Sequence, residues 1–151
     1  MKFELVSTEH KKDNMGFSYA KLPMRADSGS AGYDFYSPAS FVIKPHEKVF
    51  LWSNVKCKLE QNEVLMIYPR SSLAMKKGLV LGTVTGVIDA SYYNNIDNEG
   101  NIGLPLYNIS DEEITIELGD RIAQGVAIKY IVAEDDITKG ERRGGFGSSG
   151  I

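Results

Sequence analysis

Short runs of β-forming residues, separated by turn residues, constrain the fold of this chain more than any other sequence feature. They cover residues 2–6, 32–37, 48–52, 63–69, 79–85, 102–107 and 121–130. The runs recur roughly every ten residues, and no long helical periodicity lies between them. This spacing is typical of a β-sandwich, jelly roll or barrel and not of alternating β/α units, so the sequence predicts an all-β fold.

One segment, residues 71–78, departs from the strand pattern. It begins with Ser71, a residue type suited to an N-cap, and ends at Gly78, which suits a helix C-terminus. The sequence therefore predicts one short helix directly after the strand that Pro69 ends. Arg70 and Ser71 would lie at the helix N-terminus, where free backbone N–H groups can receive a phosphate, although an ordinary capped helix explains the same residues.

Composition and charge limit the class of protein. The chain has 151 residues, 42% hydrophobic and 25% charged, as expected for one globular domain that folds without disulfides. The single cysteine, Cys57, suits a reducing compartment and a buried position. No apolar segment near the N-terminus is long enough for a signal peptide or a membrane span, so we predict a cytoplasmic protein with no membrane partner. The net charge of −3 argues against nucleic-acid binding.

The last residues of the chain suggest a phosphorylated ligand. Residues 140–150 are rich in Gly and Ser and include Arg142 and Phe146. Glycines let a backbone approach a ligand, arginines bind phosphate oxygens, and an aromatic ring can stack on a base, although the same composition also fits a solvated terminus. We predict a β domain over residues 1–138 and a flexible Gly-rich arm over residues 139–151.

Polar residues in three other segments are candidates for chemistry. Asp34 follows a flexible loop at residues 27–30, and Asp89 comes directly after two apolar residues, where it could serve as general base for a water molecule. Arg121 and Gln124 lie in the last β-forming run, and their odd spacing predicts that they face opposite sides of a strand. Ordinary structural roles, as turn aspartates and an ion-paired arginine, explain these residues as well.

These segments occur together in an order and spacing that resembles the trimeric dUTPase (deoxyuridine triphosphate nucleotidohydrolase) family. The similar segments are residues 31–37, 69–79, 82–92, 119–124 and 142–150, so the resemblance covers nearly the whole chain. It implies a jelly-roll-like β-sandwich or barrel of the β-clip type with one short helix. It also implies a homotrimer with active sites shared between subunits, each closed by a flexible C-terminal arm.

Members of this family hydrolyse dUTP to dUMP and pyrophosphate with Mg²⁺, which limits uracil in DNA and supplies dUMP for dTMP synthesis. By resemblance, Asp89 would be the general base for the water that attacks the α-phosphorus. Tyr92 would pack under the deoxyribose and exclude a 2′-hydroxyl, and Asp34 would hold magnesium through a coordinated water. The residues implied for substrate binding are Arg70, Ser71, Ser72, Thr83, Gly86, Tyr92, Gly100, Ile102, Gln124, Arg142, Phe146, Gly147, Ser148 and Ser149.

The resemblance also divides these residues by the part of the nucleotide that they would contact. Arg70, Ser71 and Gln124 would contact the phosphate chain, and backbone groups of a hairpin would bind uracil. Phe146 would stack on the base while the arm folds onto the γ-phosphate and shuts out water. The arginine of the arm that contacts phosphate would be Arg142, with the following arginine as the alternative.

Two positions depart from the family pattern. Relatives have a glycine almost directly after the motif tyrosine, whereas Tyr92 and Gly100 are separated here by residues 93–99. The insertion predicts a hairpin with an enlarged tip or a bulge, and a tolerated surface loop is the simpler interpretation. Thr83 stands where some relatives carry an asparagine that helps to bind the base, so a side-chain role for Thr83 stays open.

Two other functions are alternatives. A dCTP deaminase shares the fold but needs a glutamate in the strand after the hairpin, where this chain has Pro105. A regulatory dUTPase-like protein would act through a protein partner, for which the inserted loop offers a surface. The presence of Asp89, Tyr92 and Arg70 favours catalysis, with a regulatory partner left open in addition.

Overall fold

The structure is a computed structural model that describes residues 1–139. In these residues, β-strands account for nearly all of the regular structure. The strands are β1 (Lys2–Leu5), β2 (Met24–Arg25), β3 (Tyr33–Tyr36), β4 (Phe41–Ile43), β5 (Lys48–Trp52), β6 (Val55–Lys58), β7 (Glu63–Pro69), β8 (Leu79–Leu81), β9 (Gly86–Asp89), β10 (Gly103–Asn108), β11 (Ile114–Ile116) and β12 (Arg121–Lys129). The helix is α1 (Ser71–Lys77), and two 3₁₀ turns are η1 (Thr8–His10) and η2 (Ala90–Tyr92). The all-β prediction with one short α-helix is thereby confirmed.

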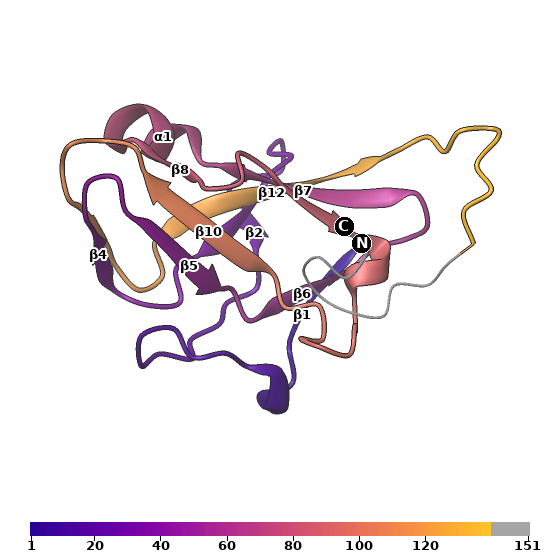
Figure 1. Ribbon diagram of the computed structural model, residues 1–151, viewed down its shortest axis with the longest axis horizontal. Coiled ribbons are helices and arrows are strands. Elements are labelled where there is room, and N and C mark those ends of the chain that lie inside the picture. Colours follow the sequence, from indigo (N-terminus) through magenta and orange to yellow (C-terminus); the bar gives the residue numbers. More distant parts are fainter. Residues whose placement is uncertain (140–151) are drawn as a thin grey trace.

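The strands form two larger sheets and two small antiparallel pairs. The five-stranded sheet has the order β2-β3-β12-β7-β9, and the three-stranded sheet has the order β5-β10-β8. Figure 1 shows β5 and β10 lying side by side, and β1 pairs with β6 as β4 pairs with β11. All the pairings are antiparallel, and most join strands far apart in the sequence, so the neighbours of a strand are set by the whole fold.

Apolar side chains from both larger sheets meet in one core. Phe35 on β3 and Leu65 on β7 come from the five-stranded sheet, and Leu51 on β5 with Leu104 on β10 come from the three-stranded sheet. Burial of a side chain of this size stabilises the fold by about 1.5–3 kcal/mol. The strand β10 shows the pattern clearly, because its residues alternate between buried and partly exposed.

The predicted strands agree with the structure where long β-forming runs are bounded by turns. β5 and β7 have the predicted bounds. The run at residues 79–85 is shorter than predicted, since β8 ends at Leu81 and a turn with Val84 at a positive φ of 66° follows. The short strands β2, β4, β6, β9 and β11 lie outside the predicted runs, because two to four residues give little periodicity by which to identify a strand.

The helix prediction is correct in place but wrong at its N-cap. Ser71 is the first helical residue, and Arg70 is the N-cap, with an extended backbone and no capping hydrogen bond from its side chain. Gly78 ends the helix as predicted, in the left-handed conformation with a φ of 69°. An arginine side chain has only donors and cannot cap the free N–H groups of a helix; the Arg70 guanidinium instead pairs with Asp34.

Cys57 on β6 is buried, as the sequence predicts. Burial raises the pKa of its thiol to about 12, so the thiol stays protonated and unreactive near neutral pH. Within residues 1–139 there is also no helix of the length and hydrophobicity that crossing a membrane requires.

Candidate active site

Three strands of the five-stranded sheet bring together the residues that are predicted to bind phosphate. Asp34 on β3 pairs with Gln124 on β12, and Gln124 pairs with Tyr68 on β7, which leads into Arg70 and Ser71. Asp34, Arg70, Ser71 and Gln124 line one open pocket of about 400 Å³. Four residues that the sequence analysis selected from three separate segments therefore share one site.

The carboxylate of Asp34 organises the positive charge of this pocket. Asp34 is 6% exposed. Its Oδ1 lies 2.9 Å from Arg70 Nε, and its Oδ2 lies 3.2 Å from Arg121 Nη1. A carboxylate buried to this degree is tolerated because two guanidinium groups compensate its charge. Two arginines against one carboxylate leave net positive charge beside the pocket, which suits an anionic ligand.

The prediction that Arg121 and Gln124 face opposite sides of a strand is wrong. The register of β12 against β3 shifts between Arg121 and Ala123, and Ile122 and Ala123 are both buried in succession. This β-bulge breaks the alternation of side chains. Arg121 therefore reaches Asp34, which shares its pocket with Gln124.

The side chain of Gln124 is held in place by the backbone on two sides. Its Nε2 donates a hydrogen bond to the Pro69 carbonyl oxygen at 3.2 Å. A Cβ atom on Gly32 would lie 2.6 Å from Gln124 Oε1, so only glycine leaves room for this amide. Sequence reasoning did not single out Gly32, and it allowed an ion pair for Arg121 without identifying Asp34 as the partner, because both contacts cross strands.

The proposed base lies far from this pocket within one chain. Asp89, at the end of β9, pairs with Val64, whereas Arg70 follows the other end of β7. The six residues from Val64 to Arg70 correspond to roughly 20 Å of extended chain. Asp89 is exposed, next to η2 and Tyr92. The structure thus brings together the four residues predicted to bind phosphate but does not bring Asp89 to them.

Tyr92 is buried, at 3% exposure, and packs in the apolar core cluster. Its hydroxyl donates a hydrogen bond to the Asn101 carbonyl oxygen at 2.8 Å. Gly100 returns the inserted loop to the same place, with a φ of 82°, and a Cβ atom there would lie 2.8 Å from the Tyr92 carbonyl oxygen. The two ends of the insertion therefore adjoin, but the strands that flank it, β9 and β10, lie in different sheets, so they do not form the predicted hairpin.

The inserted loop is anchored to β1, β6 and the segment before η1. Glu99 pairs with Lys56 at 2.5 Å and accepts a hydrogen bond from the Ser7 backbone at 2.7 Å, and the Tyr93 hydroxyl donates to Glu4. Burial alone would raise the pKa of Glu99, but the hydrogen bonds from Lys56 and Ser7 outweigh it and lower this pKa to about 2. The loop is therefore an ordered part of the fold and is tied down by a charged cluster.

Thr83 and Gly86 line a second pocket, of about 450 Å³, together with Gly103, Leu104 and Pro105. The residues that line it are apolar or uncharged. Such a pocket suits a flat, uncharged ring.

The backbone groups of Ile102 and Gly100 are already in use. Ile102 is buried, and its N–H donates to the Val55 carbonyl oxygen at 2.9 Å. The Gly100 N–H donates to Asn98 Oδ1 at 3.0 Å. Contact of uracil with either N–H would have to replace one of these bonds.

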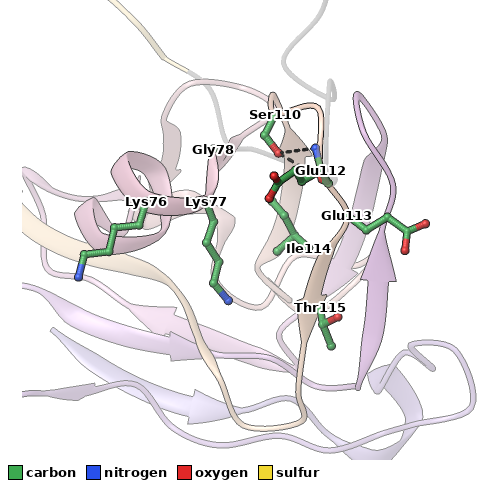
Figure 2. Close-up of a pocket in the computed structure, with 8 residues that line it drawn as sticks. All are labelled: Lys76, Lys77, Gly78, Ser110, Glu112, Glu113, Ile114 and Thr115. Carbon is green, nitrogen blue, oxygen red and sulfur yellow. Dashed lines mark hydrogen bonds between the residues drawn. The ribbon is translucent and has the colours of Figure 1, made fainter.

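A third pocket, of about 460 Å³, lies at the end of α1 and contains none of the predicted site residues. Figure 2 shows Lys77 of α1 on one side and Glu112 and Ile114 on the other. The Ser110 hydroxyl accepts a hydrogen bond from the Glu112 backbone at 3.3 Å and donates one to its carbonyl oxygen at 3.2 Å. Charges of both signs line this pocket, so it gives no preference for an anion.

The remaining predicted residues lie on α1 or beyond the described part of the chain. Ser72 is exposed on α1, next to Ser71. Arg142, Phe146, Gly147, Ser148 and Ser149 lie outside the described residues, and so does most of the predicted arm. In residues 1–139 no three His, Cys, Asp or Glu side chains are grouped to hold a metal ion. Asp34 is the carboxylate of the first pocket, which fits a magnesium ion that keeps its waters and takes its other ligands from phosphates.

Known protein sequences are similar to this chain over nearly its whole length. The family model described as dUTPase matches residues 18–150. The chain is 43% identical to the deoxyuridine 5′-triphosphate nucleotidohydrolase of Lactococcus lactis subsp. lactis over 150 residues, which is 98% of this chain and 96% of that protein.

Solved structures show the same fold. The crystal structure of dUTPase from Streptococcus mutans is similar with a TM-score of 0.74 and 34% identity, over 89% of this chain and 99% of that one. A dUTPase mutant from phage phi11 of S. aureus, described as revealing the coordination of a structural Mg(II) ion, has a TM-score of 0.70 at 23% identity, over 92% and 96% of the two chains. Because the family model covers most of the chain and the Lactococcus relative is 43% identical over nearly all of it, the chain belongs to the dUTPase family.

Proposed function

We propose that this protein hydrolyses dUTP to dUMP and pyrophosphate by attack of water on the α-phosphorus. The observation that carries the proposal is the pocket in which Asp34, Arg70, Ser71 and Gln124 meet, in a chain of the dUTPase family. The named relatives are deoxyuridine 5′-triphosphate nucleotidohydrolases. A cytoplasmic enzyme of this kind would limit uracil in DNA and supply dUMP.

The pocket supplies groups that suit a triphosphate. Arg70 is fixed by its Nε bond to Asp34, so its remaining N–H groups can donate to phosphate oxygens without a search for the right orientation. The hydroxyl of Ser71, supported by Ser72, and the amide of Gln124 add uncharged donors. Charge that develops on the leaving pyrophosphate is stabilised by these donors, which lie in place before the reaction.

Magnesium would enter with the nucleotide. The dUTPase of phage phi11 contains a Mg(II) ion. In this chain Asp34 would hold the ion through a coordinated water, because its two oxygens already pair with arginines. When bound, the ion would neutralise phosphate charge.

Asp89 would orient and deprotonate the attacking water. A carboxylate at an exposed strand end can reach a water molecule on the substrate side. The neighbouring residue, Ile88, packs in the core and so anchors this end of the strand. Uracil would enter the uncharged pocket beside Thr83 and Gly86 and meet backbone groups of residues 100–102. Tyr92 would pack under the deoxyribose and leave no room for a 2′-hydroxyl.

The complete site would be shared between copies of the chain in a homotrimer. The separation of roughly 20 Å between Asp89 and Arg70 along β7 exceeds the distance over which one nucleotide could be both bound and attacked within one chain. Residues 130–139, which leave the sheet after β12 (yellow in Figure 1), are exposed and include apolar side chains such as Ile131, at 97%. Such a segment suits contact with a second copy.

The predicted arm, residues 139–151, would close this shared site. Phe146 would stack on uracil, and Arg142 with Ser148, Ser149 and the Gly147 backbone would bind the γ-phosphate and exclude water. Residues 1–138 would form the β domain that carries the arm.

The first experiment is an assay of pyrophosphate release from dUTP, dCTP, UTP and dTTP, with Mg²⁺ and again with excess chelator. Rapid release from dUTP alone, lost with the chelator, is the expected result. Release of ammonia from dCTP would instead favour the deaminase. The structure argues against that outcome, because none of the residues within 1–139 that line the pocket around Pro105 has an ionisable side chain.

A regulatory protein is the second alternative. The inserted loop presents Ile96, which is 81% exposed, to solvent. If no nucleotide is hydrolysed but the protein binds a protein partner through this loop, the regulatory function would replace the proposed one.

A further inference from the structure

The inner side of the inserted loop contacts the residue proposed to select the sugar. Asn98 is 5% exposed, and its Nδ2 donates a hydrogen bond to Tyr92 Oη at 2.8 Å. The Tyr92 hydroxyl itself donates to the Asn101 carbonyl oxygen. Among the described residues, the phenol oxygen therefore has two hydrogen-bond partners, of which Asn98 belongs to the insertion.

The amide of Asn98 has a fixed orientation. Its Oδ1 accepts hydrogen bonds from Asn95 Nδ2 at 2.7 Å and from the Gly100 N–H at 3.0 Å. Asn95 is fixed in turn, since its Nδ2 also donates to the Tyr92 carbonyl oxygen at 2.8 Å and its Oδ1 accepts from the Asn98 N–H at 3.2 Å. Two donors turn the oxygen of Asn98 toward Asn95 and Gly100, so its nitrogen faces Tyr92.

The outer side of the loop is fixed independently. Glu99 pairs with Lys56 on β6, and Asn94 Oδ1 accepts a hydrogen bond from the same Lys56 at 2.8 Å. Tyr93 donates to Glu4 on β1. Because the loop is tied down on both sides, Asn98 cannot follow Tyr92 if the ring tilts.

We propose that Asn98 is a positioning residue for sugar selection, which acts by holding the Tyr92 ring through its hydroxyl. This inference rests on the proposed function, in which Tyr92 lies against the deoxyribose. A ring that can tilt makes room for a 2′-hydroxyl, whereas a ring fixed at Oη does not, so discrimination against UTP depends on the rigidity of Tyr92 as well as on its presence. The insertion that departs from the family pattern thereby takes part in substrate selection.

The test is the Asn98→Asp variant. Aspartate has the same shape and keeps the acceptor for Asn95 and Gly100, but it has no N–H to donate to Tyr92. The matched control is Asn94→Asp, which makes the same change of charge in the same loop, at an exposed residue on the outer side. For each protein, kcat and KM would be measured with dUTP and UTP, together with equilibrium binding of dUMP and UMP and the melting temperature.

We expect Asn98→Asp to lower the preference for dUTP over UTP about tenfold, chiefly through KM, and to lower the preference for dUMP over UMP in binding by a similar factor. Asn94→Asp should retain the wild-type preferences. Tyr92→Phe, which removes the acceptor, should reproduce the loss, and Asn98→Asp should cause no further loss when added to Tyr92→Phe.

Two results would overturn the inference alone, with dUTP hydrolysis by the wild type intact. One is an unchanged dUTP preference in folded Asn98→Asp, and the other is an equal additional loss of preference in the Tyr92→Phe background. Wild-type protein that neither hydrolyses dUTP nor binds dUMP would reject the proposed function and this inference with it.

Discussion

At the scale of single residues, the two aspartates of the candidate site have different surroundings, which suit one to positioning arginines and the other to activating water. In the described contacts, the side chains that donate hydrogen bonds to the Asp34 carboxylate are those of Arg70 and Arg121. These bonds fix both arginines at the pocket. Asp89 lies elsewhere on an exposed strand end, where a carboxylate can meet water. Substitutions of the two aspartates should therefore have different effects on binding and turnover.

Asp89→Asn should leave nucleotide binding nearly intact and reduce kcat by at least about 10²-fold, because an amide can orient a water but cannot accept its proton. The measurement is kcat for dUTP beside the affinity for dUMP. Asp97→Asn, in the inserted loop, serves as a control for the loss of a negative charge nearby. Equal kcat values in Asp89→Asn and the wild type would reject Asp89 as the base.

Gly32→Ala should impair activity with little loss of stability. The added Cβ would lie 2.6 Å from Gln124 Oε1, and the end of this flexible side chain can move away, which breaks its bond to Pro69. We expect a rise of about tenfold in KM for dUTP with a change in melting temperature of about 2 °C or less. Gly29→Ala, where a Cβ would meet Asp27 at an ordinary 3.4 Å, is the control.

At the scale of elements, the inserted loop is stabilised by a charge cluster whose strength depends on pH. The pKa of Glu99 is about 2, below the usual value of 4.5, so its contribution to stability is complete above about pH 4.5 and is lost as the pH falls toward 2. Lys56, which is buried, would lose its ionic partner over the same range.

Glu99→Gln should lower the free energy of unfolding by about 1–3 kcal/mol at pH 7, because a hydrogen-bonded charge pair is broken. The difference from the wild type should shrink between about pH 4.5 and pH 2. Thermal melts from pH 7 to pH 3 would measure it, with the exposed Glu113→Gln as control. A difference that stays constant over this range would contradict the assigned pKa.

At the scale of the whole molecule, β7 separates the predicted phosphate-binding residues from the proposed general base, since Arg70 follows one end of the strand and Asp89 lies beside the other. Arg70→Ala and Asp89→Asn chains should each be inactive, but they damage opposite ends of this strand. If a homotrimer combines ends from different chains, random assembly of equal amounts of the two variants should restore about a quarter of wild-type activity. The measurement is dUTP hydrolysis after the mixed chains are unfolded and refolded together.

The control for this experiment is a mixture of Arg70→Ala and Gln124→Ala, which damage the same half of the site. Such a mixture should stay inactive. Failure of the first mixture to exceed its separate components, with mixed trimers present, would mean that each site is built from one chain.

The sequence predicted the fold class and most of the pocket, since both depend on local patterns. β5 and β7 are dense runs of β-forming residues, and the resemblance to dUTPases selected Asp34, Arg70 and Gln124. The bulge at Ile122 and the register of β9 on β7 could not be predicted, because both are set by pairing between distant segments. The network around Asn98 escaped prediction for the same reason, as an Asn-rich insertion has the composition of an ordinary surface loop.

The buried thiol of Cys57 has a practical consequence for spectroscopy. Because the native cysteine is buried in β6 and stays protonated, it need not be replaced before a new cysteine is introduced for labelling. A cysteine introduced as Ile96→Cys, at a position 81% exposed, would take a maleimide dye selectively. Fluorescence from such a dye would follow the inserted loop in real time as nucleotide enters beside Asn98.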